Sequence, residues 1–76
     1  MTEKSVAVVT GGGTGIGAAC VRALSAAGFR VGIHYRSSRA RAGALLGEIP
    51  DGFLLCGDLA NIDDAEKMLQ QVKAEA

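Results

Sequence analysis

The chain has 76 residues, of which 49% are hydrophobic and 21% are charged, and its formal net charge is +0 at pH 7. These values limit it to one small globular domain and exclude a disordered chain or a disulfide-stapled one. It contains no apolar run near the ~20 residues of a membrane span and no signal-peptide layout, so we expect a cytoplasmic protein. Cys20 and Cys56 have no metal-binding spacing, and each falls in an apolar pattern. We therefore expect no metal site and two buried, reduced thiols, although a disulfide between them stays open.

The first part of the chain is typical of a strand followed by a helix. Residues 5–10 form a β-branched apolar run, as in a strand that is buried on both faces. Residues 15–27 change to a helical period, and Gly28 follows where a left-handed residue commonly ends a helix. The expected buried stripe of this helix consists of Ile16, Ala19, Cys20, Ala23, Leu24 and Ala27.

A second unit of the same kind comes next. Residues 30–35 read RVGIHY and predict a strand. Residues 38 to about 47 predict a weaker helix, for which Ser37 or Ser38 would be the N-terminal cap.

A third unit completes the chain. The composition of residues 49–52 predicts a turn, and residues 53–56 predict a strand that ends at Gly57. Asn61 or Asp63 would cap the last helix. The expected buried residues of that helix are Ile62, Ala65, Met68, Leu69 and Val72.

This alternation of strands and helices predicts an α/β fold with a parallel sheet and right-handed crossovers. We expect a three-layer Rossmann-type half-domain with strand order 3-2-1, which is an incomplete doubly wound fold. Residues 1–76 would then be the N-terminal, dinucleotide-binding part of one domain. The first strand would lack a partner at one edge, so we expect either the remainder of a longer domain or self-association there.

The strongest motif is the segment 10–17, which reads TGGGTGIG between the first strand and the first helix. Glycines in this place permit a tight turn, a close approach of the backbone to a pyrophosphate and close packing of helix on strand. The start of the helix adds unsatisfied N–H groups and a positive dipole end. A merely flexible turn is the alternative, and a Walker-type loop is excluded because no Gly-Lys-Ser/Thr follows. We therefore expect a bound dinucleotide.

Two glycine registers are open in this segment. Gly13-x-Gly15-x-x-Ala18 fits the general dinucleotide fingerprint, whereas Thr10-Gly11-x-x-x-Gly15-x-Gly17 is more particular. The second pattern, together with Asp58-Leu59 after the third strand, resembles the short-chain dehydrogenase/reductase family along the whole chain.

The resemblance implies roles for individual residues. Those expected to face the pyrophosphate are Gly11, Gly13, Thr14, Gly15 and Ile16. Gly17 would set the helix packing, Asp58 would accept a hydrogen bond from the adenine amino group, and the N–H of Leu59 would lie beside it. The alternative for Asp58 is an ordinary Asx turn or cap.

The end of the second strand bears on the choice of cofactor. NAD-binding proteins place a carboxylate there for the ribose 2′-hydroxyl, whereas a nearby arginine accommodates a 2′-phosphate. This chain has Tyr35, Arg36, Ser37 and Ser38 at that place, with no carboxylate close by. Arg36 can bind a phosphate with two N–H groups, helped by the serines and by Arg39, so the segment favours NADP(H) over NAD(H). The alternative is a solvated loop arginine.

The resemblance also indicates what these residues lack. The catalytic serine, the Tyr-x-x-x-Lys pair and the Asn-Ala-Gly segment of the family are absent, and Tyr35 has no lysine four residues later. His34 lies far from where a nicotinamide would sit, so we interpret it as structural or near the adenosine. We therefore assign no catalytic residue within residues 1–76.

For an intact family member, we expect hydride transfer between nicotinamide and a small carbonyl or alcohol substrate, and we expect these residues alone to be inactive. The alternative is a non-enzymatic nucleotide-binding or self-associating module. A nucleic-acid partner is disfavoured, because the chain has few aromatic residues and no recognisable nucleic-acid motif.

Overall fold

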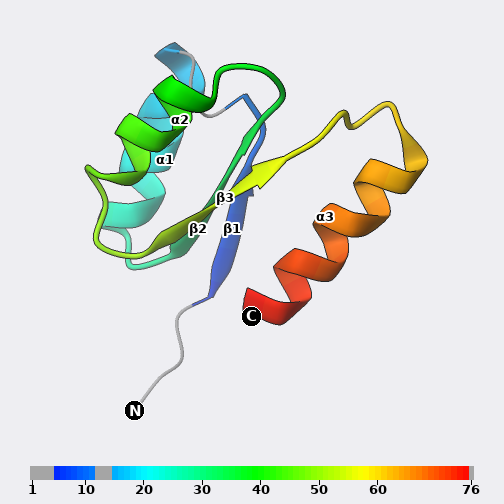
Figure 1. The fold of residues 1–76 in the computed structure, drawn as a ribbon. Coiled ribbons are helices and arrows are strands. Elements are labelled where there is room, and N and C mark those ends of the chain that lie inside the picture. The colour runs from blue at the N-terminus through cyan, green and yellow to red at the C-terminus, as the bar shows by residue number, and fades with distance from the viewer. Residues whose placement is uncertain (1–4, 12–14, 76) are drawn as a thin grey trace.

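The computed structural model describes residues 5–11 and 15–75, and its ribbon alternates strands and helices as the sequence predicts (Figure 1). The elements are β1 (Val6–Val9), α1 (Gly15–Ala26), β2 (Arg30–Tyr35), α2 (Arg39–Leu46), β3 (Gly52–Cys56) and α3 (Ile62–Glu75). From β1 to β3, each end lies within about one residue of the expected one, which is the usual ambiguity of element ends.

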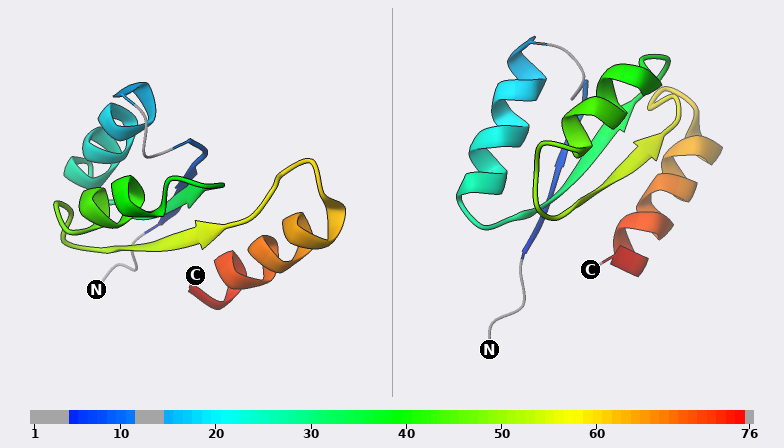
Figure 2. Two further views of the ribbon diagram at one scale, coloured as in Figure 1. Left: turned by 45° about the horizontal axis from the view of Figure 1, so that its top comes forward. Right: turned by 60° about the vertical axis from the view of Figure 1, so that its left-hand side comes forward.

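The three strands form one parallel sheet in the order β1-β2-β3, which is the predicted order read from the other edge. Helices α1 and α2 cover one face of the sheet, and α3 lies on the other face (Figure 2). This arrangement confirms the predicted three-layer Rossmann-type half-domain. Because the strands are parallel, the connections that leave their carboxyl ends meet at one edge of the sheet.

The larger part of the core lies between the sheet and the pair α1 and α2. Its buried residues are Val21, Val31, Ile33, Tyr35, Ala42 and Leu45. A smaller cluster on the other face joins Phe53 and Leu55 of β3 to Met68 of α3. Alternate residues of β2 and β3 point to opposite faces, so each strand contributes to both layers.

The expected buried stripe of α1 is wrong for most of its members. The buried residues of this helix are Gly17 and Val21, whereas the side chain of Ile16 is 84% exposed. Ala19, Cys20, Ala23 and Ala27 are also exposed, and Leu24 is half-buried. Small and apolar residues cover most of the circumference of α1, so their period could not indicate which side meets the sheet.

The expected stripe of α3 is correct in part. Met68 is buried, and Ala65 and Val72 are half-buried. Ile62 and Leu69 were expected inside, but they are 75% and 55% exposed. The helix packs mainly on β3, so none of the residues that the structure describes fully covers Ile62 and Leu69.

The two cysteines and the first strand are more exposed than the sequence predicts. Cys20 and Cys56 are both exposed, free thiols, so the expectation of buried ones is wrong. Strand β1 is only half-covered, and Val8 is 43% exposed. Residues 5–11 and 15–75 therefore leave these apolar positions at least partly exposed.

The helix ends follow local chemistry. Gly28 has φ +95, and the N–H of Phe29 donates to the carbonyl of Leu24 at 3.1 Å, as expected for a glycine-terminated helix. Asn61 Oδ1 accepts hydrogen bonds from the N–H groups of Asp63 and Asp64, which settles the cap of α3. Ser38 occupies the cap position of α2, but its side chain makes no capping hydrogen bond. Across the described residues, no helix has the length and apolar character to cross a membrane.

Candidate functional site

The expected phosphate-binding turn joins β1 to α1. Gly11 has φ +65, a conformation that favours glycine, so the tight-turn role predicted for a glycine applies to this residue. Gly17 is buried on the side of α1 that meets the sheet, which fits the predicted close packing of helix on strand. The predicted residues Gly13 and Thr14 lie outside the described residues.

Gly15 and Ile16 form the start of α1, and both are exposed. Gly15 has no positive φ, and a Cβ atom built on it would meet nothing within 4 Å. The fold of the described residues therefore gives no reason for a glycine at this position. A ligand that approaches the backbone closely would give one.

The connection from β2 to α2 carries the predicted cofactor-selecting residues. Arg36, Ser37 and Ser38 are all exposed there. Arg36 Nη2 lies 3.5 Å from Asp58 Oδ2, and the two side chains are 74% and 38% exposed. The structure thus brings together two site residues that the sequence predicted separately.

Tyr35 is placed differently from its neighbours. Its side chain is only 6% exposed and belongs to the core cluster beneath α1 and α2. Its hydroxyl oxygen accepts a hydrogen bond from Arg39 Nη1 at 2.8 Å. Tyr35 therefore presents its side chain to Arg39 and the core, and it orients that arginine at the start of α2.

The connection from β3 to α3 carries Asp58 and Leu59. Asp58 Oδ1 accepts a hydrogen bond from the N–H of Ala60 at 2.9 Å, so the Asx turn considered from the sequence is present. The second carboxylate oxygen is the one that lies near Arg36. Leu59 is 53% exposed. Asp58 therefore forms the turn with one carboxylate oxygen, and the other oxygen is directed to Arg36.

Two further residues hold this connection. His34 Nε2 lies 2.8 Å from the carbonyl oxygen of Gly57, and Asp64 Oδ2 accepts a hydrogen bond from the N–H of Asp58 at 3.0 Å. The sequence indicated that His34 is structural or near the adenosine, but it did not indicate its partner. Asp64 was missed altogether, and its only signal was an acidic residue in the first turn of a helix.

A pocket of about 200 Å³ opens between the sheet and α3. Its lining residues are Val8, Thr10, His34, Leu55, Leu59, Ala65, Met68, Leu69 and Val72. They are mostly apolar, and Val8 and Leu69 are among the exposed large hydrophobic residues. The pocket therefore marks apolar surface beside the free edge of β1.

Comparison with known proteins identifies the family. The family model described as short chain dehydrogenase matches residues 5–76. The chain belongs to the short-chain dehydrogenase family. No curated protein sequence matches the chain.

Solved structures with the same fold include two proteins that are described as short-chain dehydrogenases. A protein described as a short-chain dehydrogenase/reductase from Sinorhizobium meliloti 1021 is 30% identical, with a TM-score of 0.90 over 99% of this chain. A short chain dehydrogenase from Bacillus anthracis str. 'Ames Ancestor' is 27% identical, with a TM-score of 0.84 over 93% of this chain. A blue fluorescent protein from a metagenomic library, in complex with NADPH, is 34% identical, with a TM-score of 0.81 over 90% of this chain.

The chain spans about a third of the length of these structures. The matched shares are 36%, 31% and 30% of the Sinorhizobium, Bacillus and metagenomic proteins, respectively.

Proposed function

We propose that residues 1–76 bind the adenosine and pyrophosphate end of NADP(H) for a short-chain dehydrogenase. In the whole protein, hydride would pass between the nicotinamide and a small carbonyl or alcohol substrate. The start of α1 would bind the pyrophosphate, Arg36 the 2′-phosphate and Asp58 the adenine amino group. These residues would bind and orient the cofactor, and the proton chemistry would come from the rest of the protein.

The observation that carries this proposal is the exposed glycine at the start of α1. Packing and backbone conformation account for Gly17 and Gly11, respectively, but neither accounts for Gly15. A bare backbone at the first turn of a helix allows a diphosphate to approach N–H groups that have no partner within the helix. We infer that Gly15 serves the ligand rather than the fold.

The preference for NADP(H) rests on Arg36. Its present partner is Asp58, and an exposed ion pair of this kind is worth only about 0–1 kcal/mol. Charge-assisted hydrogen bonds from an arginine to a phosphate are worth about 1.5–3 kcal/mol. A 2′-phosphate can therefore displace Asp58 from Arg36, which leaves the carboxylate available to the adenine. The NADPH bound to the metagenomic relative supports the same choice.

The free edge of β1 and the apolar pocket support the proposal that this chain is part of a larger domain. Val8 on β1 and Leu69 on α3 are exposed hydrophobic residues that line this pocket. Burial of such surface stabilises a fold by about 25 cal/mol per Å². We infer that the remainder of the domain covers this edge and supplies the catalytic residues, and that residues 1–76 alone are inactive.

The proposal is tested by Gly15→Ala, with Gly43→Ala as the matched control. Both glycines are helical, and a Cβ atom at either position meets nothing within 4 Å. Each substitution should leave the free energy of unfolding unchanged or raise it by up to about 1 kcal/mol. Only Gly15→Ala should weaken NADPH binding. The expected decrease in affinity is about tenfold or more, which corresponds to a loss of binding free energy of at least about 1.4 kcal/mol. Equal NADPH affinities for the two variants would remove the central support for a dinucleotide site here.

A further inference from the structure

A single peptide unit in the β3–α3 connection is held by two side chains from opposite sides. This unit consists of the carbonyl of Gly57 and the N–H of Asp58. The carbonyl faces His34 Nε2 at 2.8 Å, and the N–H donates to Asp64 Oδ2 at 3.0 Å. The two side chains come from β2 and α3, so they connect the sheet to the helix through this peptide.

The peptide lies where the sheet ends. The last paired residues of β2 and β3 are Tyr35 and Cys56, and the N–H of Gly57 still donates to the carbonyl of Tyr35 at 3.3 Å. Beyond this bond, the orientation of the Gly57–Asp58 peptide depends on side chains. A rotation of this peptide would move the Cα–Cβ bond of Asp58 and therefore its carboxylate.

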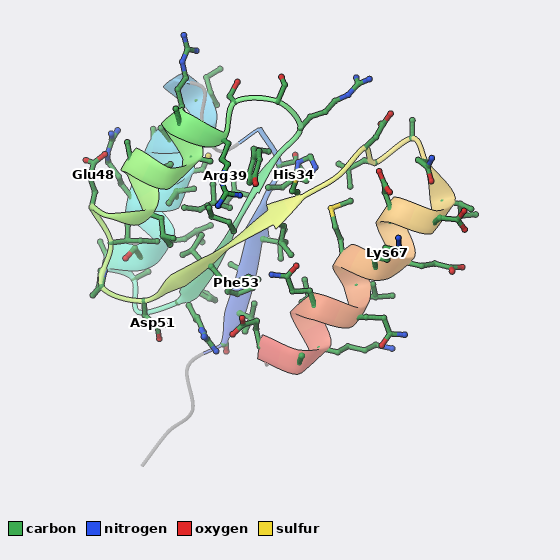
Figure 3. All side chains as sticks on the ribbon, viewed as in Figure 1. His34, Arg39, Glu48, Asp51, Phe53 and Lys67 are labelled. Atoms are coloured by element: carbon green, nitrogen blue, oxygen red, sulfur yellow. The ribbon has the colours of Figure 1, made fainter. Side chains whose placement is uncertain are left out.

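His34 is unusual for its surroundings. It is 7% exposed, and it lines the same apolar pocket as Leu55 and Met68. In Figure 3, it lies near the end of the strands from which the β3–α3 connection leaves, whereas Asp51 lies at the opposite end of the sheet. A carbonyl oxygen only accepts, so His34 Nε2 carries the hydrogen in this contact.

The other ring nitrogen, Nδ1, adds a free-energy cost to the burial of His34. Nδ1 is buried and has no hydrogen-bond partner among residues 5–11 and 15–75. A buried polar atom without a partner costs about 1–3 kcal/mol. An apolar side chain would avoid this cost but would lose the hydrogen bond to Gly57, so we attribute the histidine to this hydrogen bond.

We propose that His34 and Asp64 are positioning residues that orient Asp58 for recognition of the adenine amino group. The inference rests on the proposed function, and it adds two residues to the adenosine site: His34 contacts the carbonyl of Gly57, and Asp64 accepts from the N–H of Asp58 in the same peptide unit. Neither residue contacts the reacting atoms. Their effect is to keep the Asp58 carboxylate oxygen that lies near Arg36 in a fixed place.

The test compares NADPH with its hypoxanthine analogue, which lacks the amino group that Asp58 would bind. Affinities are measured by calorimetry on the whole polypeptide that contains these residues. The unchanged protein should bind NADPH about tenfold more tightly than the analogue, because a hydrogen bond to a charged group is worth about 1.5–3 kcal/mol. In His34→Leu and Asp64→Ala, this preference should fall to about twofold or less, since the carboxylate is no longer fixed.

Two conservative variants and a control complete the experiment. His34→Gln and Asp64→Asn keep a donor and an acceptor at the two positions, so both should restore most of the preference. Gln71→Ala removes a side-chain hydrogen bond of 2.9 Å from α3 to the carbonyl of Leu54 on β3, and it should leave the preference unchanged.

The outcomes separate the inference from the proposed function. If the unchanged protein binds neither nucleotide, the proposed function fails. If it binds NADPH but His34→Leu and Asp64→Ala retain the full preference over the analogue, the inference fails and the proposed function stands. An equal loss of affinity for both nucleotides, with the preference intact, would show a structural role only and would also overturn the inference.

Discussion

The aromatic ring of Phe53 lies directly against the backbone of Gly32 on the neighbouring strand. The two residues are partners in the parallel register, and a Cβ atom on Gly32 would come within 2.8 Å of Phe53 Cζ. The ring therefore uses the space that a side chain on β2 would occupy, on the face that α3 covers. This contact depends on the absence of a Cβ atom.

Gly32→Ala should destabilise the protein by about 1–3 kcal/mol, because the ring must move away from its packed position. The control is Gly43→Ala, since a Cβ atom at that position meets nothing within 4 Å. Chemical denaturation of both variants checks the prediction. A free energy of unfolding for Gly32→Ala equal to that of the unchanged protein would show that the ring has another place to go.

Arg30 lies at the start of β2 and connects this strand to β3 and α3. Its guanidinium lies 3.1 Å from Asp51 Oδ1 and 2.6 Å from Glu75 Oε1, and its Cζ lies 5.5 Å from the centroid of the Phe53 ring. Its side chain is 31% exposed. Arg30→Met should lower the free energy of unfolding by about 1–2 kcal/mol, because the substitution removes the cation that both carboxylates contact in this partly buried network.

Arg22→Met is the control for Arg30. Arg22 forms an ion pair of 3.1 Å with Glu48, but both side chains are more than half exposed. We expect a loss within about 0.5 kcal/mol for this exposed pair. Equal losses for the two variants in denaturant unfolding would contradict the role of Arg30 as a connection between β2, β3 and α3.

Arg36→Ala tests the choice of cofactor. Removal of the guanidinium should weaken NADPH binding by about tenfold or more and change NADH binding by less than about twofold. Arg22→Ala, which removes the same charge from α1, should affect neither nucleotide. Fluorescence titration with the two reduced cofactors measures the ratio, and a parallel loss for both would refute the assignment of Arg36 to the 2′-phosphate.

Leu69→Lys and Ile62→Lys test the proposal that the remainder of a larger domain covers the pocket. Leu69 and Ile62 are both exposed on α3, but of the two only Leu69 lines the pocket. In the whole polypeptide, Leu69→Lys should lower the free energy of unfolding by about 2–4 kcal/mol, since a charge would be buried. Ile62→Lys should cost less than about 0.5 kcal/mol. Small and equal effects in urea denaturation would indicate that the pocket stays open.

Features that depend on local sequence could be predicted well. The change from strand to helical period and Gly28 at the end of α1 are decided by neighbouring residues. The sequence left Asn61 and Asp63 as alternative caps of α3, and the structure shows Asn61. The parallel direction of the strands follows from the alternation of strands and helices. The short-chain dehydrogenase family followed from the glycine register and from Asp58-Leu59, and the family match confirms it.

Features that depend on the coverage of a surface were predicted poorly. Cys20 and Leu69 lie in genuine apolar patterns, but no part of the described chain covers them. A period shows that a face is apolar, and it does not show which neighbour buries that face. The same limit applies to contacts between distant residues, such as Arg36 with Asp58 and His34 with Gly57.

The most direct test of the account is a calorimetric titration of the protein with NADPH, NADH and adenosine 2′,5′-bisphosphate. We predict one site per chain that binds NADPH about tenfold or more tightly than NADH, since the 2′-phosphate adds charge-assisted hydrogen bonds. Adenosine 2′,5′-bisphosphate should compete with NADPH for that site. Absence of binding by all three ligands to the folded protein would contradict the claim that the start of α1 and its neighbouring connections form a dinucleotide site.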